Sequence, residues 1–427
     1  MKRFIRVLII TILILCMSVC LFSCKTKKVE DSKVSVLDDR FDLTNAVLNT
    51  IKETFYDDID YDAADLYAAY GIVNSLGDYN YIYSTADLLG SSSDGKGFGL
   101  ILRNTIYNEH LIDFILPGSP FLQESNGHTA MRGDEIYAID DFRVAGLTNS
   151  TFSAFVKTIG SDNDVKFTLR RNDETFDVTY RKIDFYFPYC IYINDLPGVP
   201  SDLGYIYLRT FDKTTNVAEE FKQAVKSFNA DGNRALILDI RGNGGGSAEV
   251  LRSISSALIG NNVNKDEALF EIHYAKEGRS VYITPTDVRD KIDTPIYVLC
   301  DGGTASASEA LIGTMKAHGT LTALIGTTTV GKGVAQNGFT TYEPGEKGVL
   351  VDKGIDENGE EIDIGVYLMQ IIVGKYYIFD KSVEGGKYCI HGQPFTPEYL
   401  IESEIQVTPD YSEDNYICKV IELYNQN

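Results

Sequence analysis

The chain has 427 residues, 44% of them hydrophobic and 23% charged, and its formal net charge is −22. A chain of this length has room for two or three domains, and this composition excludes disorder throughout. The excess of acidic residues excludes non-specific binding to nucleic acids, because contacts to phosphate need a basic surface.

The start of the chain has the layout of a bacterial export signal. A short basic stretch, MKRFIR, is followed by a long apolar run and by LFSC, which ends at Cys24. LFSC resembles a lipobox, whose cysteine is acylated and becomes the new N-terminus. We therefore expect a signal peptide over residues 1–23, a lipid anchor at Cys24 and a tether over residues 24–36. The alternative is an uncleaved anchor helix, since the run is near the short limit for a membrane span.

Residues 37–88 are predicted to form an N-terminal helical region. Two stretches, LTNAVLNTIKETF and DAADLYAAYGIVNSL, carry apolar residues at spacings of three and four. The acidic DDIDYDAAD between them lacks the glycine and the final glutamate of a calcium loop, so we interpret it as a solvated helix start.

Residues 89–183 are predicted to form a small β-rich domain, with strands such as EIYAID and DVKFTLRR and a short helix near STFSAFVKTI. Gly97, Phe98, Gly99 and Leu100 together resemble the carboxylate-binding loop of a PDZ domain. PGSP and the later MRGDEIYAID resemble the bacterial PDZ signature. In such a loop, glycines let backbone N–H groups point at a terminal carboxylate while a strand edge pairs with the peptide. The resemblance implies that this domain binds proteins or peptides with free C-termini.

Residues 186–427 alternate between predicted strands and helices. LGYIYLRTF, RALILDI, TPIYVLC and TALIG are apolar strands, whereas NVAEEFKQAVKSFNA and AEVLRSISSALIG are amphipathic helices. Repeated strand–helix units predict a largely parallel sheet with helices packed on it.

A run of glycines ends one of these strands, in LILDIRGNGGG. Glycine at the carboxyl end of a parallel strand lets backbone N–H groups come close to an anion. Phosphate is one candidate, but no Walker lysine follows and the order of the glycines differs from a dinucleotide fingerprint. The other candidate is the oxyanion of an acyl-transfer reaction.

Ser306 lies in DGGTASASEALIGTMKAHG, at the turn between a predicted strand and a predicted helix. Such a turn exposes a serine beside free N–H groups, which suits a nucleophile. A serine nucleophile needs a base, and none of the five histidines lies in a motif. Lys332 lies between two glycines in TTTVGKGVAQNGF, and burial beside Ser306 would lower its pKa and make it a neutral base. The side-chain amide of Gln336 could orient that amine.

Together these segments resemble the carboxyl-terminal processing peptidases, also called tail-specific proteases. TASASE matches the nucleophile motif of that family, GKG followed by glutamine matches its base, and DIRGNGGG matches its glycine segment. SLGDYNYIYS is similar to the stretch that precedes the PDZ domain in the family, although its proline is missing. The resemblance implies these roles: Ser306 as nucleophile, Lys332 as base, Gln336 as its partner, and the N–H groups of Ala307 and of Gly245 or Gly246 as oxyanion donors.

The resemblance implies an α/β fold: a crotonase- or ClpP-like peptidase core with an inserted PDZ domain and an N-terminal helical region. The expected protein is a lipid-anchored serine endopeptidase of the bacterial cell envelope, at the outer membrane or the periplasmic face, which cleaves proteins and peptides with free C-termini. One alternative is an inactive PDZ-bearing lipoprotein that binds C-termini. Another is a hydratase-like enzyme of the crotonase fold, which would leave the PDZ stretch unexplained. The oligomeric state stays open, with a dimer among the options.

No cofactor and no metal site are expected, because neither CxxC nor HExxH occurs. Four cysteines lie beyond the predicted lipobox. Cys300 falls in an apolar strand and is predicted to be buried. Cys389 and Cys418 could pair in an oxidising compartment, although their spacing does not require it.

Overall fold

The computed structural model describes residues 43, 46–47, 50–51, 61–84, 95–105, 107–160, 162–259, 266–340, 351–355, 361–402 and 406–426. The predicted signal peptide, Cys24 and the tether lie outside these residues. The chain divides into two units, Met1–Ala69 and Tyr70–Asn427. The described residues of the first unit are helical and include the start of α3 (Tyr61–Asn74). A search of the described helices for a membrane-spanning segment finds none of sufficient length and apolarity.

The core of the second unit is a six-stranded sheet in the order β10-β11-β12-β15-β16-β21. All neighbours from β11 to β21 are parallel, and only β10 runs antiparallel to β11. This arrangement matches the predicted strand–helix repeats. The strands are β10 (Cys190–Ile193), β11 (Leu203–Leu208), β12 (Ala235–Asp239), β15 (Ile296–Cys300), β16 (Leu321–Gly326) and β21 (Tyr399–Leu400).

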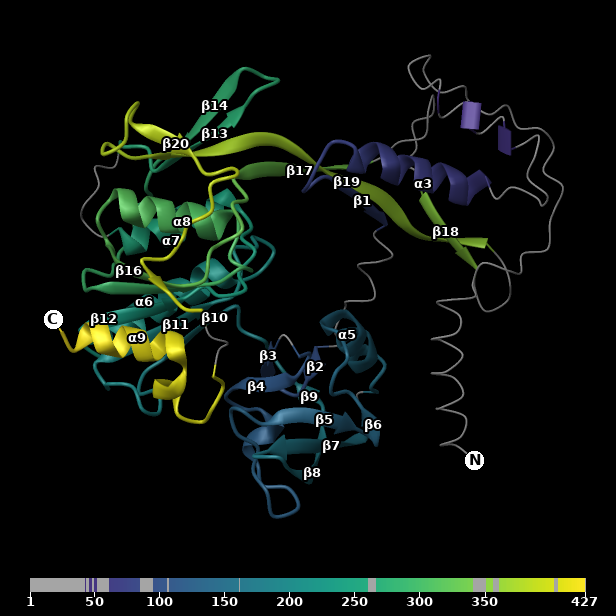
Figure 1. The fold of residues 1–427 in the computed structure, drawn as a ribbon, viewed down its shortest axis with the longest axis vertical. Helices are drawn as coiled ribbons and strands as arrows, with labels where there is room; N and C mark the ends of the chain where they lie inside the picture. Colours follow the sequence, from purple (N-terminus) through teal and green to yellow (C-terminus); the bar gives the residue numbers. More distant parts are fainter. Residues whose placement is uncertain are drawn as a thin grey trace. The chain divides into compact units, whose positions relative to one another are not determined.

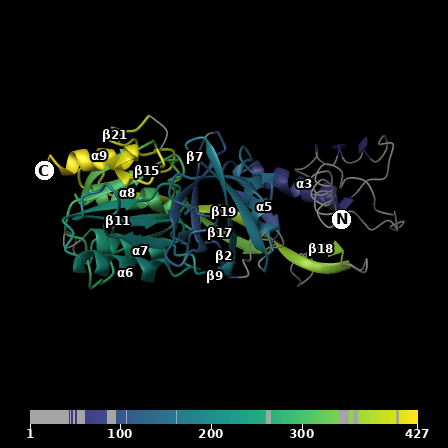
Figure 2. The ribbon, with the colours of Figure 1, turned by 90° about the horizontal axis from the view of Figure 1, so that it is seen from below.

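Alternate residues of these strands face two separate apolar clusters. Leu236 and Val298 contribute to a cluster with α6 (Val217–Ala230), α7 (Ala248–Leu258) and α8 (Ala307–Ala317). Ile237 and Tyr297 point the other way, into a cluster that includes α9 (Asn415–Tyr424). Helices therefore cover both faces of the sheet, as Figures 1 and 2 show. The two-residue side-chain period of a strand produces this division.

A second sheet is organised around one long strand, β19 (Glu361–Phe379), shown in Figure 1. Ile378 of β19 is fully buried in the same cluster as α8. The segment that carries Lys332 leads directly into one of the partner strands of β19. Those partners are β1 (Tyr81–Ser84), β13 (Phe270–Tyr274), β17 (Val334–Thr340), β18 (Val351–Ile355) and β20 (Lys387–Cys389), and β14 (Arg279–Ile283) extends the sheet from β13.

Residues 96–184 form a small β-rich domain with its own apolar core. Its main sheet has the order β3-β4-β5-β7-β8, so that β3 lies at an edge, and β6 pairs with β5. A separate pair, β2 (Lys96–Gly97) with β9 (Ile183–Asp184), closes the domain at its two ends. Helix α5 (Asn149–Lys157) is capped at its N-terminus by Thr148, whose side chain accepts a hydrogen bond from Thr151 N–H. The strands are β3 (Leu100–Asn104), β4 (His110–Ile115), β5 (Glu135–Ile139), β6 (Phe142–Arg143), β7 (Asp164–Arg171) and β8 (Glu174–Arg181).

The structure confirms the mixed α/β fold. Cys300 is fully buried in β15, as predicted. All four described cysteines are free thiols, so Cys389 and Cys418 are not paired with each other.

Candidate active site

Two loops meet at the carboxyl edge of the parallel sheet. One follows β12 and carries the glycine run, and the other follows β15 and carries Ser306. Hydrogen bonds join them: the Asp301 side chain accepts from Gly242 N–H at 2.8 Å, and the Thr304 hydroxyl donates to the Ile240 carbonyl at 3.1 Å. Because β12 and β15 are parallel neighbours, their following loops emerge side by side.

Asn243 is the centre of this junction and is fully buried. Its backbone carbonyl accepts from Ala305 N–H at 3.0 Å and from the Ser308 hydroxyl at 2.9 Å. Its side-chain oxygen accepts from Gly245 N–H at 3.0 Å, and its side-chain nitrogen donates to the Leu208 carbonyl at 2.9 Å. Asn243 thus fixes the glycine loop and the serine turn to each other.

Ser306 immediately precedes α8 and has a strained backbone, with φ of 58° and ψ of −116°. Positive φ costs energy for a residue with a side chain, and strain of this kind is concentrated at functional sites. A Cβ atom on residue 245 would lie 2.8 Å from both Ala307 N and Ser306 Cβ. Residue 245 must therefore be glycine for the two loops to approach this closely.

Two backbone N–H groups near Ser306 are available to bind an anion. No residue in the described part of the chain accepts a hydrogen bond from the N–H of Ala307 or of Gly246. Gly245 N–H, by contrast, is already bonded to Asn243. Ala307 is also the first residue of α8, where the helix dipole favours negative charge.

Glu309 connects Ser306 to the segment that carries Lys332. This fully buried carboxylate accepts from Ser306 N–H at 2.9 Å and from Lys332 N–H at 2.8 Å, both on Oε2. Its other oxygen accepts from Gly331 N–H and from the Thr329 hydroxyl, each at 2.6 Å. One carboxylate therefore holds the backbone of the predicted nucleophile and of the predicted base.

Lys332 is half-buried, and burial lowers the pKa of its amine below the ordinary value of 10.5. No carboxylate in the described ranges forms an ion pair with it. Its Nζ atom lies 5.0 Å from the centre of the Tyr79 ring. Gln336 does not bond to the amine of Lys332; its side-chain nitrogen donates to the Tyr79 backbone carbonyl.

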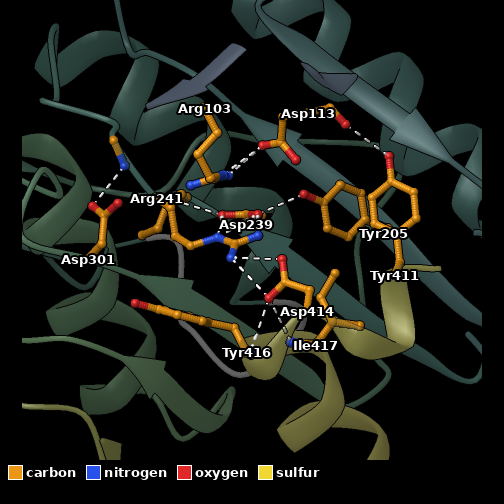
Figure 3. A network of polar contacts seen from close by, with 12 residues as sticks. Arg103, Asp113, Tyr205, Asp239, Arg241, Asp301, Tyr411, Asp414, Tyr416 and Ile417 are labelled. Carbon is orange, nitrogen blue, oxygen red and sulfur yellow. Dashed lines mark hydrogen bonds and ion pairs between the residues drawn. The ribbon is translucent and has the colours of Figure 1, made fainter. Parts of the chain in front are cut away.

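A network of buried charges lies beneath the glycine loop (Figure 3). The Arg241 guanidinium donates to Asp239 at 2.9 Å and to Asp414 at 3.1 Å. Arg132 of the small β domain donates to the same Asp414 at 3.4 Å and to Asp113 at 3.1 Å. Asp414 also caps α9 by accepting from Tyr416 N–H at 3.0 Å. The small β domain, the glycine loop and α9 are therefore tied together by ion pairs.

Asp113 belongs to the same network and also accepts from Arg103. Burial raises the pKa of Asp113, but the guanidinium groups of Arg103 and Arg132 outweigh it, so that the pKa lies below its ordinary value. Asp113 is therefore ionised at neutral pH although it is buried.

The predicted carboxylate-binding loop lies in the small β domain and is not part of this site. The Phe98 carbonyl accepts from the Ser119 hydroxyl at 2.6 Å, and the Gly99 carbonyl accepts from Leu116 N–H at 2.9 Å. Neither Phe98 N–H nor Gly99 N–H donates to a described residue. The loop leads into β3, the edge strand, which is where an added peptide strand would pair.

The structure brings Gly245 and its neighbour Gly246 close to Ser306 and Ala307. The Lys332 backbone is linked to Ser306 through the Glu309 carboxylate. None of the five histidines, all within the described ranges, hydrogen-bonds to Ser306. The sequence analysis assigned no role to Asn243, Glu309, Thr329 or Asp301. The sequence position of Glu309 did indicate a role, since a buried carboxylate next to a hydroxyl-rich turn must accept hydrogen bonds from several donors. No group of three possible metal ligands occurs within the described residues.

Comparisons with known proteins find similarity to proteases of one family. Residues 202–367 match peptidase family S41. The carboxy-terminal processing protease CtpA of Bacillus subtilis is 26% identical over 333 residues, which cover 76% of this chain and 67% of that protein. The chloroplastic C-terminal processing peptidase of Tetradesmus obliquus is 30% identical over 236 residues, 52% of this chain and 47% of that protein. The matched region thus spans between about half and two thirds of the length of these relatives.

A solved structure of an S41 protease from Bacteroides fragilis has a similar fold. Its TM-score is 0.52 at 16% identity, over 83% of this chain and 87% of that one. At this identity the likeness concerns the fold alone.

Proposed function

Because the chain belongs to the carboxyl-terminal processing peptidases of family S41, we propose that it is a serine endopeptidase with Ser306 as nucleophile and Lys332 as general base. The observation that carries this proposal is the Glu309 carboxylate, which accepts from the N–H groups of both residues. Both hydrogen bonds end on the same oxygen, so the distance between the two backbone nitrogens cannot exceed the sum of the bond lengths, 2.9 Å and 2.8 Å. Covalent catalysis requires a base beside the nucleophile, and this carboxylate holds the backbones of the two residues next to each other.

In the proposed reaction, the neutral amine of Lys332 removes the hydroxyl proton of Ser306 while the serine oxygen attacks the carbonyl carbon of the scissile bond. The ammonium group of Lys332 then gives a proton to the leaving amine as the carbon–nitrogen bond breaks. The acyl ester on Ser306 remains. Lys332 next takes a proton from water as the water oxygen attacks the ester carbon. The ammonium returns this proton to the serine oxygen as the ester bond breaks, which releases the new carboxylic acid and restores the Ser306 hydroxyl and the neutral amine.

We assign the stabilisation of the oxyanion to backbone N–H groups. Ala307 N–H is the first donor, because it has no described partner and begins α8. Gly246 N–H is the better second donor, since Gly245 N–H would have to leave Asn243 or be shared with it. Fixed donors of this kind are worth about 2.7–4 kcal/mol each in related chemistry.

We further propose that the small β domain is a PDZ domain that captures the free C-termini of substrates. The free N–H groups of Phe98 and Gly99 beside an edge strand support this role. The full-length Ser306→Ala protein should bind a peptide that ends in a carboxylate more tightly than its C-terminal amide. Equal affinities for the two peptides would contradict the proposal.

Lipid anchoring at Cys24, in the envelope of a bacterium, is likewise a proposal that rests on the LFSC segment. Cells that make the Cys24→Ser protein should incorporate no labelled palmitate into it. Labelling equal to that of the wild type would contradict the anchor.

The peptidase proposal is tested by mass spectrometry of products from an unfolded protein that carries a C-terminal label. The wild type should release fragments, whereas Ser306→Ala and Lys332→Ala should release none. A wild type that binds the substrate and releases nothing would favour the alternative of a C-terminus-binding lipoprotein.

A further inference from the structure

The segment before the small β domain reaches the proposed base. Tyr79 and Asn80 are the last residues before β1, and both belong to the same unit as Ser306 and Lys332. The Tyr79 ring lies against the Lys332 amine, with Nζ 5.0 Å from the ring centre. The Tyr79 carbonyl accepts a hydrogen bond from the Gln336 side chain. One residue thus contacts two of the groups assigned to the base.

Hydrogen bonds of the neighbouring Asn80 fix the position of Tyr79. Asn80 is buried, and its side-chain nitrogen donates to the carbonyls of Gly77 at 3.1 Å and of Leu76 at 3.3 Å. Its side-chain oxygen accepts from Ile372 N–H of β19 at 2.9 Å. Asn80 therefore folds the loop onto itself and ties it to the strand that pairs with β17.

The backbone of Tyr79 is strained, which indicates that surrounding contacts hold it in this position. Its φ is 68°, in the left-handed region that a residue with a side chain rarely adopts. Such strain persists only where surrounding contacts impose it, and it is frequent at functional sites. The contacts that impose it here are those of Asn80 and Gln336.

We propose that Tyr79 is a positioning residue for the general base: its ring covers the Lys332 amine and its carbonyl holds Gln336. This inference rests on the proposed function. It gives Gln336 an indirect role, because the glutamine fixes the Tyr79 segment and the ring in turn covers the amine. It also assigns a role to the segment SLGDYNYIYS, which contains Tyr79 and has no role in the peptidase core alone.

Two effects of the ring on Lys332 oppose each other. Removal of water from the amine disfavours its charged form, whereas the face of an aromatic ring attracts a cation. Burial lowers the pKa of Lys332, and the Tyr79 ring contributes to that burial. The ring therefore acts here as a cover that excludes water.

The elements packed against Lys332 carry further ionisable groups. Glu309 on α8 contacts the Lys332 backbone, and its oxygens accept four hydrogen bonds. His391 adjoins Gly333, where an added Cβ would lie 2.1 Å from the His391 backbone nitrogen. On β19, Lys375 is paired with Val334, and Tyr376 N–H donates to the Gly333 carbonyl. The Tyr79 phenol is a further ionisable group beside the amine.

The test compares Tyr79→Phe, Tyr79→Leu and Tyr79→Ala, with Tyr107→Ala as the matched control on an exposed loop of the small β domain. The pKa of the Lys332 amine is measured in each full-length protein by competitive labelling with acetic anhydride and mass spectrometry. Tyr79→Phe and Tyr107→Ala should match the wild type. Tyr79→Ala should raise the pKa toward 10.5, and Tyr79→Leu, which still excludes water, should raise it less.

Peptidase assays provide the second readout. In Tyr79→Ala the part of the kcat–pH profile in which activity rises should shift to higher pH. As a result, kcat near neutral pH should fall about tenfold for each pH unit of that shift. KM should change little. If Tyr79 has a purely structural role, Tyr79→Ala should lower the melting temperature and leave the rising part of the kcat–pH profile at the same pH.

Two outcomes would overturn the inference: an unchanged Lys332 pKa in a folded Tyr79→Ala protein, or an equal shift in Tyr107→Ala. If Tyr79→Ala does not fold, Tyr79→Leu against Tyr79→Phe decides in the same way. Labelling does not need a functioning nucleophile, so it gives a result even if the wild type cleaves nothing. Failure of the proposed function would appear separately, as the absence of wild-type cleavage.

Discussion

Replacement of Glu309 by glutamine should damage both stability and catalysis. The native carboxylate accepts four hydrogen bonds, two on each oxygen: from Ser306 and Lys332 N–H on one, and from Gly331 N–H and the Thr329 hydroxyl on the other. An amide has one oxygen and one NH₂ group, so it can accept on one side only. Because the Thr329 hydroxyl can rotate and accept, the NH₂ group should face Thr329 and leave Gly331 N–H without a partner.

The magnitude follows from the four bonds. Hydrogen bonds to a charged group contribute about 1.5–3 kcal/mol each, so the loss of one bond and weakening of three should cost about 2–4 kcal/mol. Glu309→Ala should cost more, since it strands four buried donors and leaves a cavity. The loop that carries Lys332 should also shift, and a displacement of about 1 Å can cost about 100-fold in kcat.

Urea unfolding and steady-state kinetics measure these effects. Glu249→Gln is the matched control, because Glu249 lies in the first turn of α7 but is exposed. The control should be within about 0.5 kcal/mol of the wild type. A Glu309→Gln protein with wild-type stability and wild-type kcat would refute the reasoning that Glu309 joins the nucleophile to the base.

Three further predictions follow from the site. Activity should rise with pH to a plateau, because the neutral amine of Lys332 is the active form and its lowered pKa moves the rise below 10.5; Lys332→Arg should be as inactive as Lys332→Ala in the same assay, since guanidinium keeps its proton. Asp414→Asn should lose about 3–5 kcal/mol in urea unfolding, because its NH₂ group would face the buried guanidinium of Arg241; a loss below 1 kcal/mol would contradict this. Gly245→Ala should abolish labelling of the active serine by a fluorophosphonate, because its Cβ would lie 2.8 Å from Ala307 N.

The parallel core was predictable because its signals are local. Apolar strands such as LILDI and TPIYVLC alternate with amphipathic helices, and the order of β12, α7, β15 and α8 follows from that pattern. The long strand β19 was not predicted. Its residues are a nearly continuous mixture of apolar and polar types, and its partners come from points as distant as β1 and β20. No local period reveals such pairings.

The same difference separates the predicted and the unpredicted parts of the site. Ser306 and Lys332 lie in short motifs that can be recognised without coordinates. The contact of Glu309 with Lys332 and that of Tyr79 with Gln336 could not be found in this way, since they join groups 23 and 257 residues apart. The Gln336–Tyr79 bond spans 257 residues. The prediction that Gln336 bonds directly to the Lys332 amine was reasonable in chemistry, but the structure has Tyr79 as its partner.

The ion pair between Arg241 and Asp414 has a consequence for biosynthesis. The two residues are 173 positions apart, which a ribosome covers in roughly 9–35 s at about 5–20 residues per second. Through that interval the glycine loop follows an arginine, Arg241, whose second carboxylate partner has not been made, and α9 is not there to cover its face of the sheet. The emerging core is therefore exposed to aggregation and to chaperones for that time. The proposed active site is therefore complete only after translation has passed Asp414.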